Sequence, residues 1–125
     1  MVRLYAHGGS GNHGCEAIVR TTVKMLESPA VLATTAPEED RRYGVEEAVT
    51  LLPDTPRQLG AVERLRHAVH FKLRHDDAVY IRLAHQDFFQ SVHPGDICLS
   101  IGGDNYCYGG TDILGIYRRG LQPRG

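Results

Sequence analysis

Two glycine-rich clusters carry the most distinctive chemistry in this sequence. The first spans His7–Gly14 with the order His-Gly-Gly-Ser-Gly-Asn-His-Gly, and the second is the Gly-Gly-Asp-Asn-Tyr segment at Gly102–Tyr106. Glycine allows a backbone to approach a ligand closely, and N–H groups at the start of a helix bind anions or hydroxyl oxygens. Histidine and carboxylate side chains transfer protons in such places. The clusters therefore predict a polar ligand site with acid–base groups.

Strands and helices alternate along the chain, and each glycine cluster follows a strand. Val2–Ala6 is a short apolar run that ends at the first cluster, and residues up to Leu26 then have helical spacing. Ile97–Ile101 precedes the second cluster. Two further strands are expected, over Ala30–Thr35 and Val49–Leu52. Three further helices are expected: one from Gln58 through Leu73, one that begins at a cap on Asp76 or Asp77 and continues through Val92, and one over Asp112–Arg119.

The strands are apolar on both faces, which is typical of a parallel sheet covered by helices on both sides. We therefore expect an α/β fold with a Rossmann-like, doubly wound sheet, forming one domain over residues 1–125. The common strand order 3-2-1-4 makes the first and fourth strands neighbours. In that order the two glycine clusters lie on either side of one crevice.

Bulk composition narrows the function classes. The chain has 125 residues with 14 Lys and Arg against 15 Asp and Glu, so the whole molecule has no field that would hold a nucleic acid. Residues 57–85 are locally basic, which we interpret as a solvated helix face in preference to a membrane-surface or anionic-polymer patch. Three cysteines outside any Cys-x-x-Cys motif, with no signal-peptide or membrane-spanning run, predict a cytoplasmic protein.

Nucleotide-binding loops are the first alternative for the glycine cluster. Gly9–Gly14 matches Gly-x-Gly-x-x-Gly, but a dinucleotide site also needs a carboxylate at the end of the second strand. That strand ends at Thr35, Glu38 lies beyond a proline, and Glu16 adds negative charge near the place of a pyrophosphate. A dinucleotide-binding domain therefore stays a minor alternative. A P-loop is excluded because no Gly-Lys-Ser/Thr follows the glycines.

Two further alternatives depend on Cys15. A cysteine phosphatase needs an arginine on the loop, whereas Arg20 falls within the predicted helix. A metal site built from His7, His13, Cys15 and Asp104 has no recognised ligand spacing. We therefore expect neither a thiol nucleophile nor a bound metal.

The two motifs together resemble the polysaccharide pyruvyl transferase family. His7–Ile18 contains the Asn-x-Gly-Cys-Glu-Ala-Ile turn from strand to helix, and Ser100–Tyr106 contains the later Gly-Gly-Asp strand end. Many family members have aspartate where this chain has Cys15. The motifs occur in the family order, and the resemblance covers the N-terminal portion of a family member.

The resemblance implies a fold similar to the N-terminal domain of glycosyltransferase-B enzymes, with a second domain across a cleft. It implies transfer of the enolpyruvyl group of phosphoenolpyruvate onto hydroxyls of a cell-surface saccharide or its lipid-linked precursor, with a place at the membrane surface. Phosphoenolpyruvate is then a donor substrate and no cofactor is expected. Cations for the donor come from the missing second domain.

The candidate site follows from the residues and the resemblance together. The alternative function is a non-catalytic domain that binds a sugar or a partner chain, which the absence of arginines near the crevice favours. The expected catalytic residues are Asp104, His13 and Glu16, and the expected substrate-binding residues are His7, Gly8, Gly9, Asn12, Gly14, Gly102, Gly103, Asn105 and Tyr106.

Overall fold

A four-stranded, all-parallel sheet is the centre of the molecule. The computed structural model describes residues 1–102. Its strand order is β3-β2-β1-β4, which confirms the predicted 3-2-1-4 order. The strands are β1 (Val2–His7), β2 (Ala30–Thr34), β3 (Thr50–Pro53) and β4 (Ile97–Ser100). The expected helix over Asp112–Arg119 lies outside the described residues.

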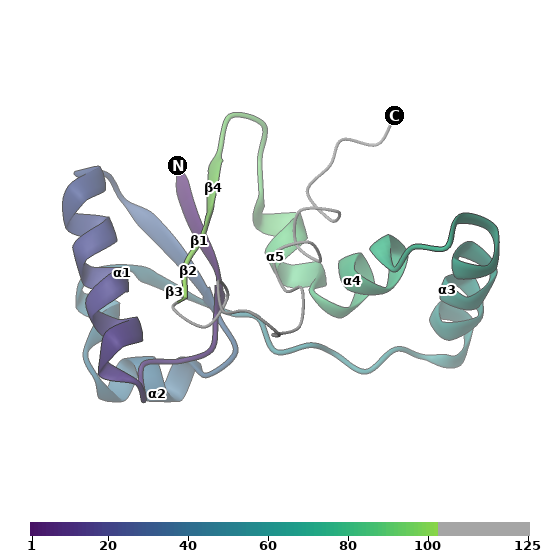
Figure 1. Cartoon of the computed structure of the whole chain (residues 1–125), viewed down its shortest axis with the longest axis horizontal. Helices are drawn as coiled ribbons and strands as arrows, with labels where there is room; N and C mark the ends of the chain where they lie inside the picture. Colours follow the sequence, from purple (N-terminus) through teal and green to yellow (C-terminus); the bar gives the residue numbers. More distant parts are fainter. Residues whose placement is uncertain (103–125) are drawn as a thin grey trace.

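Helices flank the sheet, as a uniformly apolar parallel sheet requires, and the fold is compatible with a Rossmann-like domain. Figure 1 shows α1 and α2 on one side of the strands and α5 on the other. The helical elements are α1 (His13–Leu26), α2 (Pro37–Arg42), the 3-10 turn η1 (Val45–Glu47), α3 (Ala61–Arg74), α4 (Ala78–Ala84) and α5 (Gln86–Ser91).

Two apolar clusters form the core, one on each face of the sheet. Leu4 and Leu32 point toward Val19 of α1 and Val45 of η1, and all four side chains have no exposed surface. On the opposite face Tyr5 and Ala33 pack against Phe88 of α5. The side chains of successive strand residues thus point to opposite faces of the sheet. Because helices cover both faces, the strand sequences are apolar throughout.

The segment after β3 leads away from the sheet. Figure 1 shows an extended stretch running from β3 to α3, which lies at the end of the molecule opposite α1. Gly60 precedes α3, and the Glu63 side chain accepts a hydrogen bond from its N–H at 2.9 Å. This cap begins the helix at Ala61, so the predicted helix from Gln58 starts later than expected. None of the residues of α3 is buried.

The predicted continuous helix from Asp76 or Asp77 through Val92 is wrong, because the chain breaks at His85 into α4 and α5. Asp77 is the N-cap of α4, and the carboxylate of the preceding Asp76 accepts a hydrogen bond from the Ala78 N–H at 3.0 Å. At the break, Arg57 donates hydrogen bonds to two carbonyls of the last turn of α4. Its backbone N–H donates to Ala84 and its Nε to Leu83, each at 3.0 Å. These carbonyls are thereby satisfied without a continuing helix.

Among residues 1–102, each helix is too short or too polar to cross a lipid bilayer.

Candidate functional site

The carboxyl ends of β1 and β4 lie side by side. The strands pair in parallel with Tyr5 opposite Ser100, and the Ile101 N–H donates to the Tyr5 carbonyl at 2.9 Å. The loop of residues 8–12, called the glycine loop below, follows β1, and Gly102 follows β4. The structure therefore brings the glycine loop and Gly102 to one edge of the sheet, as the strand order predicts. Gly103, Asp104, Asn105 and Tyr106 lie outside the described residues.

A backbone irregularity at Ala6 orients the residue that precedes the glycine loop. Ala6 has φ 63°, in the left-handed region that non-glycine residues rarely adopt. The pairing of β1 with β2 shifts register between Leu4 and His7 at the same place. A bulge of this kind redirects the following side chain. Here the His7 ring meets Asp40 of α2 instead of following the strand alternation.

His7 belongs to a buried polar cluster that anchors the glycine loop. The Asp40 carboxylate accepts from Nε2 of His7 at 2.9 Å and from the Ser10 hydroxyl at 2.5 Å. Its second oxygen accepts from the Thr34 hydroxyl at 2.5 Å. All four residues are buried, so the cluster joins the ends of β1 and β2, the glycine loop and α2.

The buried position of His7 changes its expected role. We expected its side chain to bind substrate and transfer protons in the crevice, but the ring has no exposed surface. Its Nε2 bonds to Asp40, and its Nδ1 is buried without a hydrogen-bond partner among residues 1–102. The His7 side chain is therefore a positioning group for the glycine loop in this structure.

The Glu39 carboxylate lies against Gly9 and Gly11 of the glycine loop. A Cβ atom placed on Gly9 or on Gly11 would overlap its carboxylate, and Gly9 also has φ 110°. No atom of the described part of the chain, in contrast, lies within 4 Å of a Cβ placed on Gly8. The close backbone approach that the glycines permit is thus made to a carboxylate of the same chain. Sequence patterns missed Glu39 because α2 brings it to the loop from 30 residues away.

The charge of the Glu39 carboxylate determines which ligands the glycine loop suits chemically. A phosphate or pyrophosphate placed there would face the negative charge of Glu39, which disfavours the dinucleotide alternative. A saccharide hydroxyl, in contrast, donates a strong hydrogen bond to a carboxylate. The loop with Glu39 therefore suits a neutral, hydroxyl-rich ligand better than an anion.

Asn12, an expected substrate-binding residue, is the N-cap of α1. Its side chain accepts a hydrogen bond from the Gly14 N–H at 2.9 Å. The His13 side chain is 82% exposed, and its ring lies edge-on to Tyr43. His13 is thus accessible to a ligand at the loop, whereas Asn12 uses its side-chain oxygen on the helix itself.

Glu16 forms ion pairs along α1. Its carboxylate accepts from Nε of Arg20 at 2.8 Å and lies 3.6 Å from Nδ1 of His13. The hydrogen bond from Arg20, with a smaller effect of His13, holds the pKa of Glu16 below its ordinary value. A carboxylate with a lowered pKa is a weaker base, so this geometry suits hydrogen bonding more than proton transfer.

An aspartate–histidine pair that sequence reasoning missed lies after β3. Nδ1 of His85 is 3.0 Å from Oδ1 of Asp54, whose side chain is 2% exposed. The Asp54 N–H also donates to the Thr34 carbonyl at 2.8 Å, which fixes Asp54 at the carboxyl edge of the sheet. The sequence pattern places His85 inside one continuous helix, because it does not predict the break between α4 and α5.

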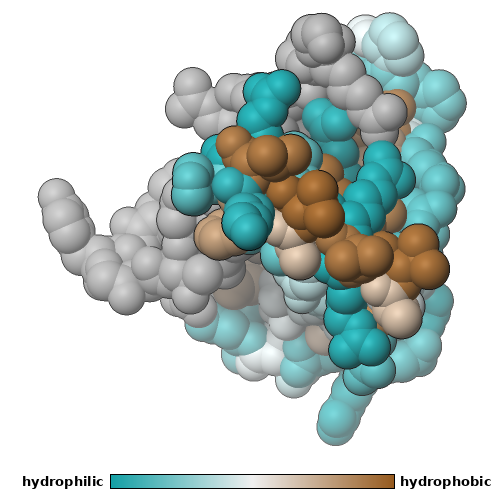
Figure 2. Space-filling view, turned by 90° about the vertical axis from the view of Figure 1, so that its right-hand side faces the viewer, coloured by the Kyte–Doolittle hydropathy of each residue, from teal (hydrophilic) through white to brown (hydrophobic). Residues whose placement is uncertain are grey.

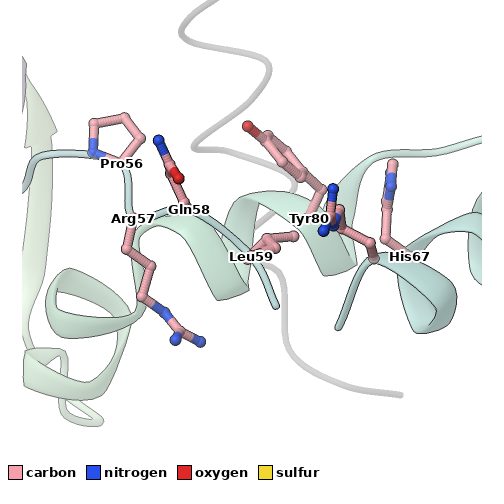
Figure 3. Close-up of a pocket in the computed structure, with 7 residues that line it drawn as sticks. Pro56, Arg57, Gln58, Leu59, His67 and Tyr80 are labelled. Atoms are coloured by element: carbon pink, nitrogen blue, oxygen red, sulfur yellow. The ribbon is translucent and has the colours of Figure 1, made fainter. Parts of the chain in front are cut away.

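A pocket of about 480 Å³ lies between the segment after β3 and the pair α3–α4. Figure 3 shows Pro56, Arg57, Gln58 and Leu59 along one wall, with His67 and Tyr80 along the other. Arg57 is engaged by Glu63 at 2.5 Å and by the Leu83 carbonyl. The pocket is on the part of the molecule that lies far from α1 in Figure 1, and so is separate from the glycine loop.

The two arginines of β1 and α1, Arg3 and Arg20, form hydrogen bonds away from the glycine loop. Arg3 donates to Asp96, which precedes β4, at 2.6 Å, so it lies at the sheet edge opposite the glycine loop. Arg20 is held by Glu16 and by the Tyr43 carbonyl. Within residues 1–102, no three His, Cys, Asp or Glu side chains group as metal ligands would.

Comparison with models of known protein families, with curated proteins and with solved structures returns no match to this chain.

Proposed function

We propose that this chain is the N-terminal, glycosyltransferase-B-like domain of an enzyme that transfers the enolpyruvyl group of phosphoenolpyruvate to a saccharide. The product is a cyclic pyruvate ketal on two sugar hydroxyls, and phosphate is released. One observation carries the proposal: the carboxyl ends of β1 and β4 are adjacent, so the glycine loop and Gly102 share an edge. The resemblance of both motifs to pyruvyl transferases supports the choice of reaction.

The reaction needs acid–base groups beside the acceptor. One hydroxyl oxygen bonds to the central carbon of phosphoenolpyruvate while a proton is added to its methylene carbon. The second hydroxyl oxygen then displaces phosphate from the same carbon. Each hydroxyl loses a proton to a base, and the departing phosphate is stabilised by cations.

The described residues fit the acceptor side of this reaction. The Glu39 carboxylate at the glycine loop accepts a hydrogen bond from a sugar hydroxyl, and the accessible His13 ring takes or gives a proton. Asp104, which follows the second glycine cluster in the sequence, is the proposed base for the attacking hydroxyl. Cations for phosphoenolpyruvate come from the second domain that the family resemblance implies.

A second candidate is a saccharide-binding domain without catalytic activity. The commitment of Arg3 to Asp96 and of Arg20 to Glu16 favours it, because neither guanidinium is available to an anionic donor at the glycine loop. The two candidates share the acceptor site and differ only in whether phosphoenolpyruvate is consumed.

Titration of the chain with neutral oligosaccharides, monitored by calorimetry, tests the acceptor site. Glu39→Gln is expected to weaken binding roughly 10- to 100-fold, since a hydrogen bond to a charged group contributes about 1.5–3 kcal/mol. Glu38→Gln is the matched control, because the Glu38 side chain is 86% exposed and pairs with Arg41. Equal binding by both variants, or no saccharide binding, contradicts the proposed acceptor site.

A phosphate-release assay with phosphoenolpyruvate and a bound oligosaccharide separates the two candidates. The transferase predicts phosphate release that requires the saccharide and is abolished by Asp104→Asn. Saccharide binding without phosphate release, across a range of acceptors and in a protein that includes the proposed second domain, supports the binding domain instead.

A further inference from the structure

Helix α3 presents a continuous apolar stripe to solvent. The stripe consists of Val62, Leu65, Val69 and Leu73, whose exposed fractions are 80%, 65%, 52% and 75%. At 3.6 residues per turn, this spacing places all four side chains along one side of the helix. Figure 2 shows the corresponding hydrophobic band between hydrophilic borders on the face that α3 occupies. An exposed apolar surface of this kind usually marks an interaction site.

The other side of α3 faces the rest of the protein. The His67 ring lies 5.3 Å from Tyr80 of α4 and 6.0 Å from Phe71. Nε2 of His67 is also 3.2 Å from Oδ1 of Asp77. On the helix, His67 and Phe71 lie opposite the stripe. Helix α3 is therefore held through its polar-aromatic side, and its apolar side points outward.

Cationic side chains border the stripe on both sides. Arg66 follows one border and Lys72 the other, both are exposed, and neither side chain has an ion pair or hydrogen bond with any residue from 1 to 102. Helix α3 carries four basic side chains and one acidic one, Glu63. Glu63 is already engaged by Arg57 and by the Gly60 N–H. The two borders of the stripe, called the positive rim below, therefore carry positive charges that the acidic side chain of α3 does not neutralise.

We propose that this face of α3 docks on an anionic lipid surface. The stripe enters the boundary between headgroups and acyl chains, while Arg66 and Lys72 extend toward lipid phosphates. A second copy of the chain is a poorer occupant, because pairing two α3 stripes would bring two positive rims together. The proposal stands on α3 alone and does not depend on the transferase function. It differs from the solvated-face interpretation of the basic segment, which stays the alternative.

Co-sedimentation with vesicles tests the docking surface. The full chain is incubated with vesicles of phosphatidylcholine alone and with equimolar phosphatidylcholine and phosphatidylglycerol. Binding is expected only to the anionic vesicles, and it weakens as salt is raised. Leu65→Glu is expected to lower the partition coefficient at least about 10-fold, and Arg66→Gln to lower it about fivefold.

Met25→Glu is the control variant, because Met25 on α1 is 79% exposed and lies outside α3. It introduces the same charge as Leu65→Glu and is expected to leave vesicle binding unchanged, and circular dichroism checks that each variant folds. The proposal is overturned by equal binding to neutral and anionic vesicles, by no binding, or by an equal loss in Met25→Glu. A dimer that forms without vesicles and is lost in Leu65→Glu would also overturn it and would identify a second copy as the occupant.

Discussion

Oδ1 of Asp40 lies 2.9 Å from Nε2 of His7, and neither side chain has any exposed surface. The same carboxylate also accepts hydrogen bonds from Ser10 and Thr34. A buried carboxylate is tolerated only when its hydrogen-bonding capacity is met, and here three donors from different segments meet it. Asp40 therefore fixes the glycine loop relative to α2 and β2.

Removing the Asp40 carboxylate should strongly destabilise the domain. Asp40→Ala leaves three buried polar groups without their acceptor, and we expect the free energy of unfolding to fall by about 3–5 kcal/mol in urea denaturation. Asp40→Asn, which keeps the size and one acceptor oxygen, should lose less. The exposed Asp87→Ala serves as control and should stay within about 0.5 kcal/mol of the wild type. A loss in Asp40→Ala no larger than that of Asp87→Ala would show that the cluster has no anchoring role.

The three glycines of the glycine loop should respond differently to alanine. Gly9→Ala places a side chain at φ 110° and overlaps the Ala36 side chain, so we expect a loss of about 1–3 kcal/mol in unfolding free energy. Gly11→Ala overlaps only the Glu39 carboxylate, which can rotate away, so its cost should be smaller. Gly8→Ala enters open space and should be nearly neutral.

Saccharide titration provides a second measurement for the same glycine variants. Because Gly11→Ala displaces the Glu39 carboxylate, it should weaken saccharide binding as much as Glu39→Gln does. A Gly11→Ala variant that is as unstable as Gly9→Ala would show that Glu39 is rigidly held at the loop.

The sheet was predictable from the sequence because the pattern that indicates it, an apolar run followed by helical spacing, is local and recurs along the chain. Four apolar runs, each separated by residues with helical spacing, favour a parallel sheet, and the common order for such folds is 3-2-1-4. The N-cap at Asn12 was predictable for the same reason, since a side chain that caps a helix acts within its own turn. Adjacency of the glycine loop and Gly102 then followed from the strand order.

The departures from the predicted site arise from contacts between distant segments. The bulge at Ala6 turns His7 toward Asp40, which is 33 residues away. Arg57 bonds to the Leu83 and Ala84 carbonyls, 26 and 27 residues further on, where α4 ends. His85, at this break, meets Asp54. The pattern of α3 likewise shows that one side is apolar, but periodicity does not say what covers that side.

Asp96 should make the stability of the domain depend on acid pH. The hydrogen bond from Arg3, with further help from the His93 N–H, holds the pKa of Asp96 well below its ordinary value. Its stabilising contribution is therefore complete above the unfolded-state pKa of about 3.9 and is lost as pH falls from there toward the lowered folded-state pKa. Urea midpoints of the wild type should fall across this range, and those of Asp96→Asn should fall less steeply.

Ser91→Ala is the control for this acid dependence. It removes a 3.0 Å hydrogen bond from Arg3 but leaves the Asp96 carboxylate in place. We expect it to lower the midpoint by a similar amount at every pH. Identical slopes for Asp96→Asn and the wild type would indicate that the Arg3–Asp96 pair does not couple protonation to folding.

The Asp54–His85 pair should fix the tautomer of the imidazole. An ionised carboxylate only accepts hydrogen bonds, so Nδ1 of His85 must donate to Oδ1 of Asp54 across the 3.0 Å between them. The neutral ring should therefore carry its proton on Nδ1, as proton-transferring histidines held by a carboxylate do. Long-range proton–nitrogen NMR measures this directly. Asp54→Asn, whose amide can donate, should shift the His85 proton toward Nε2 and leave the exposed His75 ring unaffected. Wild-type protein with the His85 proton on Nε2 would contradict the pairing.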